Sequence, residues 1–139
     1  MNLKTFSLGC VALTLLAGSA LADVPGVDKA TLAGLDKQVG KVMEGYNANN
    51  WKAFYGSGWA QQTKAMQTEQ TFNTLYTNLY LKQYGTLKNR KISESTSSFG
   101  PMNAVLMYDA DFSKKKGKLA VNWFKEGGTW KIQQLQVSP

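Results

Sequence analysis

Apolar side chains recur every three or four positions across residues 28–47. They stand at Leu32, Leu35, Val39, Val42, Met43 and Tyr46. This spacing predicts an amphipathic helix of about five turns with one apolar stripe, and Asp28 is placed to cap its start. Gly34 and Gly40 each cost about 1 kcal/mol of helix propensity relative to alanine, so we expect close packing at both.

Two more helices are predicted before residue 86. Asn50 can cap a short helix from Trp51 to Tyr55. A longer helix is expected to begin after a Thr68 cap and to end at Gly85. The side chains expected to form its buried stripe are Phe72, Leu75, Tyr76 and Leu79, with Tyr80 and Tyr84 on a neighbouring face.

The hydrophobic period then changes to two, which predicts antiparallel strands. Residues 87–98 alternate weakly, as an edge strand does, whereas residues 102–112 and 118–126 alternate clearly. The Gly127-Gly128 pair suits a two-residue hairpin connection, since both glycines accept positive φ. In the last strand the apolar phase slips at Gln133-Gln134, which predicts a β-bulge there or a strand that changes its packing partner.

The first 22 residues have the pattern of a cleaved secretory signal peptide. Lys4 precedes an apolar run over residues 6–17, and small residues at Ala20 and Ala22 predict cleavage before Asp23. An uncleaved membrane anchor is disfavoured, because the run is shorter than the roughly 20 apolar residues of a spanning helix. We therefore expect an exported chain, periplasmic or secreted, without a stable membrane anchor.

The remainder, residues 23–139, is long enough for one domain. It contains neither histidine nor cysteine, because the only cysteine is Cys10. Lipidation of Cys10 is disfavoured, since the apolar run continues beyond it. The composition of the expected domain excludes thiol nucleophiles, histidine-based triads and nearly all zinc sites. We expect no metal and no cofactor.

Carboxylates are the remaining candidates for chemistry. Asp109 and Asp111 share one strand face, opposite Tyr108, and are expected to be solvated. Glu44 lies beside the apolar stripe of the first helix and is a weaker candidate for a buried acid. A catalytic carboxylate belongs in a dry pocket beside a proton donor. No spacing in the sequence ties an acid to a tyrosine in this way, so an enzyme is the less favoured interpretation.

The chain carries a net charge of +7, nearly all from lysine, and Arg90 is its only arginine. The candidates for an anionic-surface contact are Lys88, Arg90, Lys91, Lys114, Lys115, Lys116 and Lys118. Lysines at strand edges and hairpin tips also discourage edge-to-edge pairing, so a protective role and a docking role both remain open. Nucleic acid is not an expected partner, because base and phosphate readers rely on arginine forks.

The predicted order, three helices and then four strands, defines an α+β fold with N-terminal helices packed on a curved antiparallel sheet of about four strands. Three stretches, GYNANNWKAFY, QYGTLK and NWFKEGGTWKIQQLQV, are similar to segments of the nuclear transport factor 2-like superfamily. This superfamily has a cone-shaped, cystatin-like fold and includes ketosteroid isomerases and SnoaL-like polyketide cyclases. The resemblance covers residues 28–137 and implies a cone whose open end holds a ligand.

Under this resemblance the aromatic residues become candidate ligand contacts, although ordinary core burial also explains them. They are Tyr46, Trp51, Tyr55, Tyr76, Tyr108, Trp123 and Trp130. The leading hypothesis is an exported, non-enzymatic domain that binds a small apolar or amphipathic ligand, or a protein partner, in or near the cone. The alternatives are a small isomerase-like or cyclase-like enzyme with a buried carboxylate, and a basic module that docks on anionic envelope components.

A homodimer is a further expectation. Val105, Met107 and Phe124 are apolar on the sheet face turned away from the helices, and two copies could pair through that face. Loops or the N-terminal lead-in could equally cover these side chains, and the sequence leaves both options open.

Overall fold

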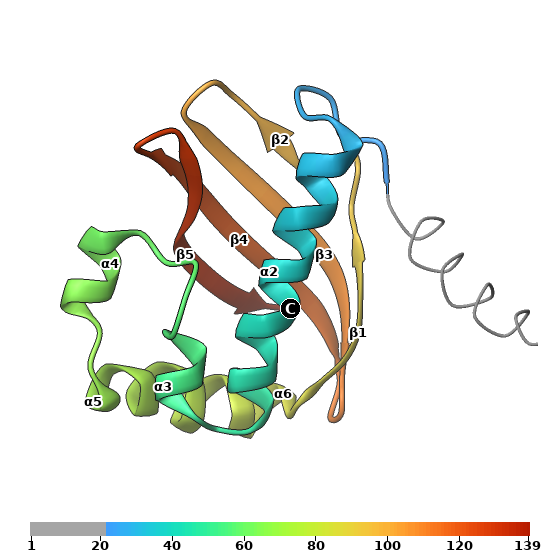
Figure 1. Ribbon diagram of the computed structural model, residues 1–139. Coiled ribbons are helices and arrows are strands. Elements are labelled where there is room, and N and C mark those ends of the chain that lie inside the picture. Colours follow the sequence, from blue (N-terminus) through green and yellow to red (C-terminus); the bar gives the residue numbers. More distant parts are fainter. Residues whose placement is uncertain (1–21) are drawn as a thin grey trace, which may run out of the picture.

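The computed structural model describes residues 22–139, in which helices pack against one curved antiparallel sheet (Figure 1). The helical elements are α2 (Lys29–Asn47), α3 (Trp51–Phe54), α4 (Gln61–Met66), α5 (Glu69–Phe72), η1 (Asn73–Leu81) and α6 (Lys82–Tyr84). The strands are β1 (Leu87–Ile92), β2 (Ser98–Phe99), β3 (Asn103–Phe112), β4 (Lys116–Glu126) and β5 (Thr129–Ser138). The predicted α+β class is confirmed, with the short β2 as a fifth strand. The expected signal peptide lies, except for its last residue, outside the described part.

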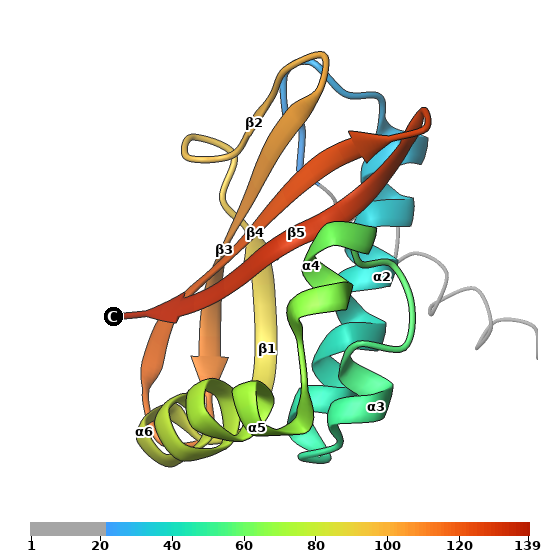
Figure 2. The same ribbon diagram turned by 90° about the vertical axis from the view of Figure 1, so that its left-hand side faces the viewer.

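The first helix forms as predicted and crosses one face of the sheet (Figure 2). The Asp28 side chain accepts the Thr31 backbone N–H at 2.7 Å and so caps α2. All six residues of the predicted apolar stripe are buried. Gly34 is open to its surroundings, so the prediction of close packing there is wrong. At Gly40 the prediction is confirmed, because a Cβ would stand 3.1 Å from Nη2 of Arg90. A still closer approach lies at Gly45, where a Cβ would stand 2.5 Å from the Phe54 backbone nitrogen.

The third predicted helix is continuous from residue 69 to residue 84, but its centre, η1, is a π-helix. A π-helix bonds each N–H to the fifth carbonyl back and so has a wider turn than an α-helix. Residues four apart therefore stay on one face, and the buried stripe is Phe72, Tyr76, Tyr80 and Tyr84. Leu79 is 39% exposed. The prediction that Leu79 belongs to the stripe, with the last two tyrosines beside it, is corrected accordingly.

The strands follow the order β1-β3-β4-β5, and the short β2 pairs with the beginning of β3, at Ala104 and Val105. The predicted two-residue hairpin is present, with Gly127 and Gly128 at φ of 60° and 82°. The predicted bulge is also present, because Asn122 pairs with Gln134 and Trp123 with Ile132, which leaves Gln133 without a partner in the ladder.

The outer edge of β5 is covered by the segment before α4, which the sequence did not predict. Ala60 donates its backbone N–H to the Ile132 carbonyl, and Ile132 donates to the Gly58 carbonyl, both at 2.7 Å. The Thr63 hydroxyl then donates to the carbonyl of Gln133 at 2.9 Å. The bulge thus provides the carbonyl that fixes α4. None of the helices described here is long and apolar enough to span a membrane.

Candidate functional site

Most of the aromatic residues singled out from the sequence lie in the protein interior. Tyr46, Tyr55, Tyr76, Tyr108 and Trp123 are buried, while Trp51 and Trp130 are partly exposed. Phe54 stands at the centre of the aromatic cluster. Its ring centroid lies within 5.3 Å of those of Tyr55, Trp59, Phe72 and Tyr76. These rings fill the space between the helices and the sheet.

The buried phenols donate hydrogen bonds to backbone carbonyls. The hydroxyl of Tyr46 donates to Gly85 and that of Tyr76 to Leu135, both at 2.9 Å. Burial raises the pKa of Tyr46 and of Tyr76 well above the usual value for tyrosine. Both phenols are therefore neutral structural donors. Their role as ligand contacts stays a prediction.

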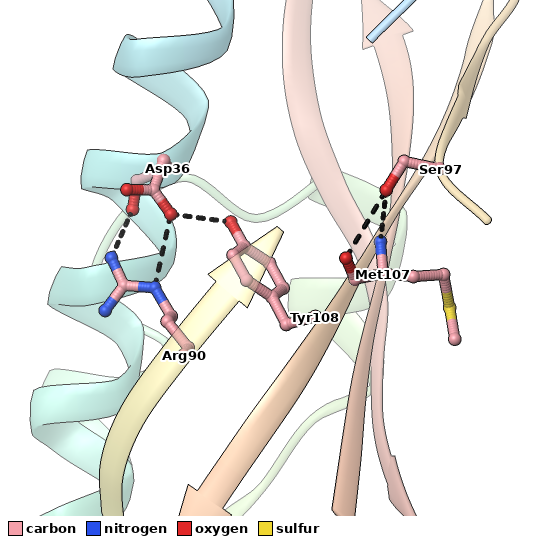
Figure 3. A network of polar contacts seen from close by, with 5 residues as sticks. All are labelled: Asp36, Arg90, Ser97, Met107 and Tyr108. Carbon is pink, nitrogen blue, oxygen red and sulfur yellow. Dashed lines mark hydrogen bonds and ion pairs between the residues drawn. The ribbon is translucent and has the colours of Figure 1, made fainter. Parts of the chain in front are cut away.

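A polar network joins α2 to the sheet in Figure 3. One carboxylate oxygen of Asp36 accepts the Tyr108 hydroxyl at 2.8 Å and the Arg90 Nε at 3.2 Å. Arg90 also donates from Nη2 to the backbone carbonyl of Asp36 at 2.9 Å. Burial, and after it the charge of Asp36, raises the pKa of Tyr108. Nearby, the Ser97 hydroxyl accepts the Met107 backbone N–H at 2.9 Å.

This network takes Arg90 out of the predicted basic surface, because its guanidinium is committed to Asp36. Sequence reasoning missed Asp36 altogether. The sequence does contain one indication of its role. Asp36 follows Leu35 of the buried stripe in the first helix, and from that position a carboxylate can reach the sheet. Asp36 lines neither of the two cavities described below. Paired with arginine and away from a cavity, it acts as a clamp between α2, β1 and β3.

The carboxylates considered from the sequence are accessible to solvent. Asp109 and Asp111 lie on the outer face of β3, as predicted, and pair with Lys118 at 2.6 Å and Lys116 at 3.2 Å. Glu44 is exposed on α2, so the prediction that it is a buried acid is wrong. It lies on the helix face turned away from the sheet. None of these three groups meets the requirement of a dry catalytic pocket.

A cavity of about 500 Å³ lies over the end of the sheet that carries these charge pairs. Lys91, Asp109 and Lys118 stand opposite one another on three neighbouring strands, and Asn89, Asp111 and Lys116 form the next row. The cavity combines both signs of charge, and both aspartates already have lysine partners. Of the seven predicted basic candidates, this end of the sheet brings Lys91, Lys116 and Lys118 together along the cavity, which Arg90 also lines although its guanidinium is bound to Asp36.

A second cavity, of about 390 Å³, lies at the opposite end of the sheet, and we call it the mouth cavity. It is lined by Gly26, Val27, Asp28, Thr31, Phe99, Gly100, Pro101, Lys125 and Trp130. Phe99 and Trp130 meet edge to face with centroids 5.5 Å apart. The Lys125 ammonium stands 5.2 Å above the Trp130 ring. Trp130 is the one predicted ligand residue that lines either of these two cavities.

Trp123 lies one row deeper in the sheet than the Lys125–Trp130 pair that lines the mouth cavity. It is two residues before Lys125 on the same strand face, and its opposite partners are Ala104 and Ile132. Its indole Nε1 is fully buried and has no hydrogen-bond partner among the residues described here. Buried donors without partners are rare and point to strain or to a functional role. Beneath the mouth cavity there is therefore an indole N–H that can still donate a hydrogen bond.

Among residues 22–139, no group of three or more histidine, cysteine, aspartate or glutamate side chains is placed to hold a metal ion. No family model matches the chain, and no curated protein matches it either.

Proposed function

We propose that this chain is an exported, non-enzymatic member of the nuclear transport factor 2-like superfamily that binds a small amphipathic ligand at the open end of its cone. The observation that carries the proposal is the mouth cavity, which combines two aromatic rings with a cation. A volume of about 390 Å³ is within the usual range for small-molecule sites, which begins near 300 Å³.

The lining of the mouth cavity indicates the chemistry of the ligand. Phe99 and Trp130 offer apolar surface for an aromatic or aliphatic body. Lys125 offers one positive charge beside that surface. Asp28 keeps its negative charge, but both of its carboxylate oxygens accept hydrogen bonds from Thr31 at the start of α2. A ligand with an apolar body and one anionic group matches these three features.

The buried indole of Trp123 supports the same proposal. Trp123, which carries this unpartnered N–H, lies one strand row beneath Lys125 and shares the row of Phe99 through Ala104. A hydrogen-bond acceptor on a ligand that penetrates past the mouth would satisfy this donor. The packed interior below, filled by the protein's own tyrosines, sets the depth to which such a ligand can enter. The proposed site is therefore shallow and aromatic, without a proton-transfer group.

The proposal is tested with two fluorescent probes of similar shape. 1-Anilinonaphthalene-8-sulfonate carries a sulfonate, and N-phenyl-1-naphthylamine is its neutral counterpart. We expect both to bind, and Trp130→Ala to weaken both about tenfold, since an aromatic contact is worth roughly 1–1.5 kcal/mol. Lys125→Gln should weaken only the sulfonate probe. Trp51→Ala serves as the matched control, because Trp51 is also a partly exposed tryptophan but does not line the mouth cavity.

The two arms of this experiment have clear contrary outcomes. Equal loss of binding in the Trp51 and Trp130 variants would mean that the probes bind elsewhere, and the mouth cavity would be rejected as the site. Equal effects of Lys125→Gln on both probes would reject the anionic character of the ligand. Native mass spectrometry of the protein recovered from the periplasm of an expressing bacterium tests export directly and detects any retained small molecule.

A further inference from the structure

Lysines from three separate elements gather at the end of the molecule opposite the mouth cavity. The β3–β4 hairpin meets the end of α6 and the start of β1 there (Figures 1 and 2). Ser113 donates its backbone N–H to the Thr86 carbonyl at 2.8 Å, and Lys114 donates to the Tyr84 carbonyl at 2.9 Å. The Lys114 ammonium also donates to the Lys82 carbonyl at 2.8 Å. These contacts fix the hairpin against the helix end.

We call this surface the basic end. It consists of Lys82, Lys88, Lys91, Lys114, Lys115, Lys116 and Lys118. Its hairpin is further held in place at Gly85, whose φ of 82° and close approach to the Ser113 hydroxyl leave no room for a side chain. The Lys115 ammonium stands 4.4 Å above the Tyr84 ring. The backbone that carries the lysines is thus preorganised, which lowers the entropic cost of binding.

Most of the positive charge at the basic end is not neutralised within the protein. Asp109 and Asp111 pair with Lys118 and Lys116. No ion pair among residues 22–139 involves the other five lysines. The remaining charge is therefore free to attract an external anion.

The arrangement of these lysines indicates the shape of that anion. They come from a hairpin, a helix end and an edge strand, so they spread over a surface and do not follow a single line. Arg90, the only arginine of the chain, is committed to Asp36 and offers no bidentate fork for a phosphate. Leu79 is 39% exposed and precedes Lys82 by three residues, so an exposed apolar side chain lies within one helical turn of the Lys82 charge.

We propose that the basic end docks on an anionic lipid bilayer. A bilayer presents negative charge over a plane, and it accepts lysines without recognising any single headgroup. An exposed leucine beside them can enter the interface between headgroups and acyl chains. The mouth cavity is lined by residues of the lead-in to α2, of β2 and of the β4–β5 hairpin. These elements lie at the end of the molecule opposite the β3–β4 hairpin (Figure 1), so a docked protein keeps that cavity open to solvent. The docking surface is independent of the ligand site.

Co-sedimentation with lipid vesicles tests the proposal, using the protein recovered from the periplasm of an expressing bacterium. We expect binding to vesicles that contain phosphatidylglycerol and none to pure phosphatidylcholine, with affinity falling steeply as salt is added. The variant Lys82→Gln/Lys88→Gln/Lys91→Gln removes three lysines whose ammonium groups make no ion pair, hydrogen bond or cation–π contact within the described residues. At about fivefold for each lysine, it should weaken binding about a hundredfold.

The matched control is Lys37→Gln/Lys64→Gln/Lys131→Gln, which removes the same net charge from α2, α4 and β5. We expect it to lose no more than a few fold, while circular dichroism confirms that both triple variants are folded. Equal weakening by the two variants would reject the basic end as the docking surface. Binding to soluble dextran sulfate without binding to the anionic vesicles would reject the bilayer as partner in favour of a linear polyanion.

Discussion

The phenol of Tyr108 donates to Oδ1 of Asp36 across 2.8 Å and so ties the middle of β3 to α2. Tyr108 is 1% exposed, and its hydroxyl depends for its acceptor on the Asp36 carboxylate, whose side chain is 31% exposed. The same carboxylate oxygen accepts from Arg90 on β1. One side chain of the helix therefore holds two strands of the sheet in position, and its removal should be costly.

We predict that Asp36→Ala lowers the free energy of unfolding by about 3 kcal/mol, because it leaves a buried hydroxyl and a partly buried guanidinium without their acceptor. Tyr108→Phe removes only one hydrogen bond to a charged group and should cost about 2 kcal/mol. Urea denaturation measures both. Asp109→Ala is the control, since its exposed pair with Lys118 should be worth less than about 1 kcal/mol. An Asp36 variant no less stable than the Asp109 variant would contradict the clamp.

The two glycines Gly45 and Gly34 lie in the same helix but should respond oppositely to alanine. At Gly45 a Cβ would stand 2.5 Å from a backbone atom of Phe54, which a side-chain rotation cannot relieve. We expect Gly45→Ala to destabilise the protein by about 3 kcal/mol through the forced separation of α2 and α3. At Gly34 nothing lies within 4 Å, so alanine should stabilise by about 1 kcal/mol through helix propensity. Thermal unfolding of both variants gives the comparison.

The contrast between these glycines illustrates what the sequence could and could not predict. Periodicity predicted α2, its Asp28 cap and its buried stripe, because those features depend on neighbours along the chain. The Gly127-Gly128 turn and the bulge at Gln133 were also readable, since each follows from a local pattern. Which glycine sits against another helix depends on how α2 and α3 cross in space. No local pattern carries that information.

The candidate site was less predictable than the fold, for the same reason. Trp130 was predicted and lines the mouth cavity, and Lys125 lies directly opposite it across the predicted hairpin. Phe99 becomes its neighbour only through the pairing of β2 with β3, which no local pattern predicts. Asp36 was missed because its partners are distant in the chain. The face of the third helix was misassigned because a 3.6-residue period was applied to a segment that forms a π-helix.

The register of the π-helix has a direct test in the neighbouring residues Leu79 and Tyr80. An α-helical period places Leu79 in the core. In the structure Leu79 is 39% exposed, whereas Tyr80 is only 9% exposed. We predict that Tyr80→Ala costs about 3 kcal/mol of unfolding free energy, as large truncations in a core do. Leu79→Ala should cost less than about 1 kcal/mol. The reverse order in denaturant titrations would mean that the segment follows the α-helical register.

The buried tyrosines predict a loss of stability at alkaline pH. The pKa is raised for Tyr46, Tyr55, Tyr76 and Tyr108, in each case mainly by burial. Above about pH 10 the unfolded chain releases these protons while the native state retains them. The unfolded state then binds fewer protons, so the free energy of unfolding falls as pH rises, by up to about 1.4 kcal/mol per pH unit for each tyrosine.

Two spectra recorded during one alkaline titration test this prediction. The phenolate absorbance of these tyrosines should rise together with the loss of the circular dichroism signal, because the four groups ionise only when the protein unfolds. Tyr76→Phe removes one of these titrating groups. The slope of the free energy of unfolding against pH should therefore decrease by the contribution of one proton, whatever the substitution does to stability at neutral pH. Ionisation of all tyrosines before any unfolding would contradict the closed aromatic interior. It would then favour a ligand that enters deep among the phenols over one confined to the mouth cavity.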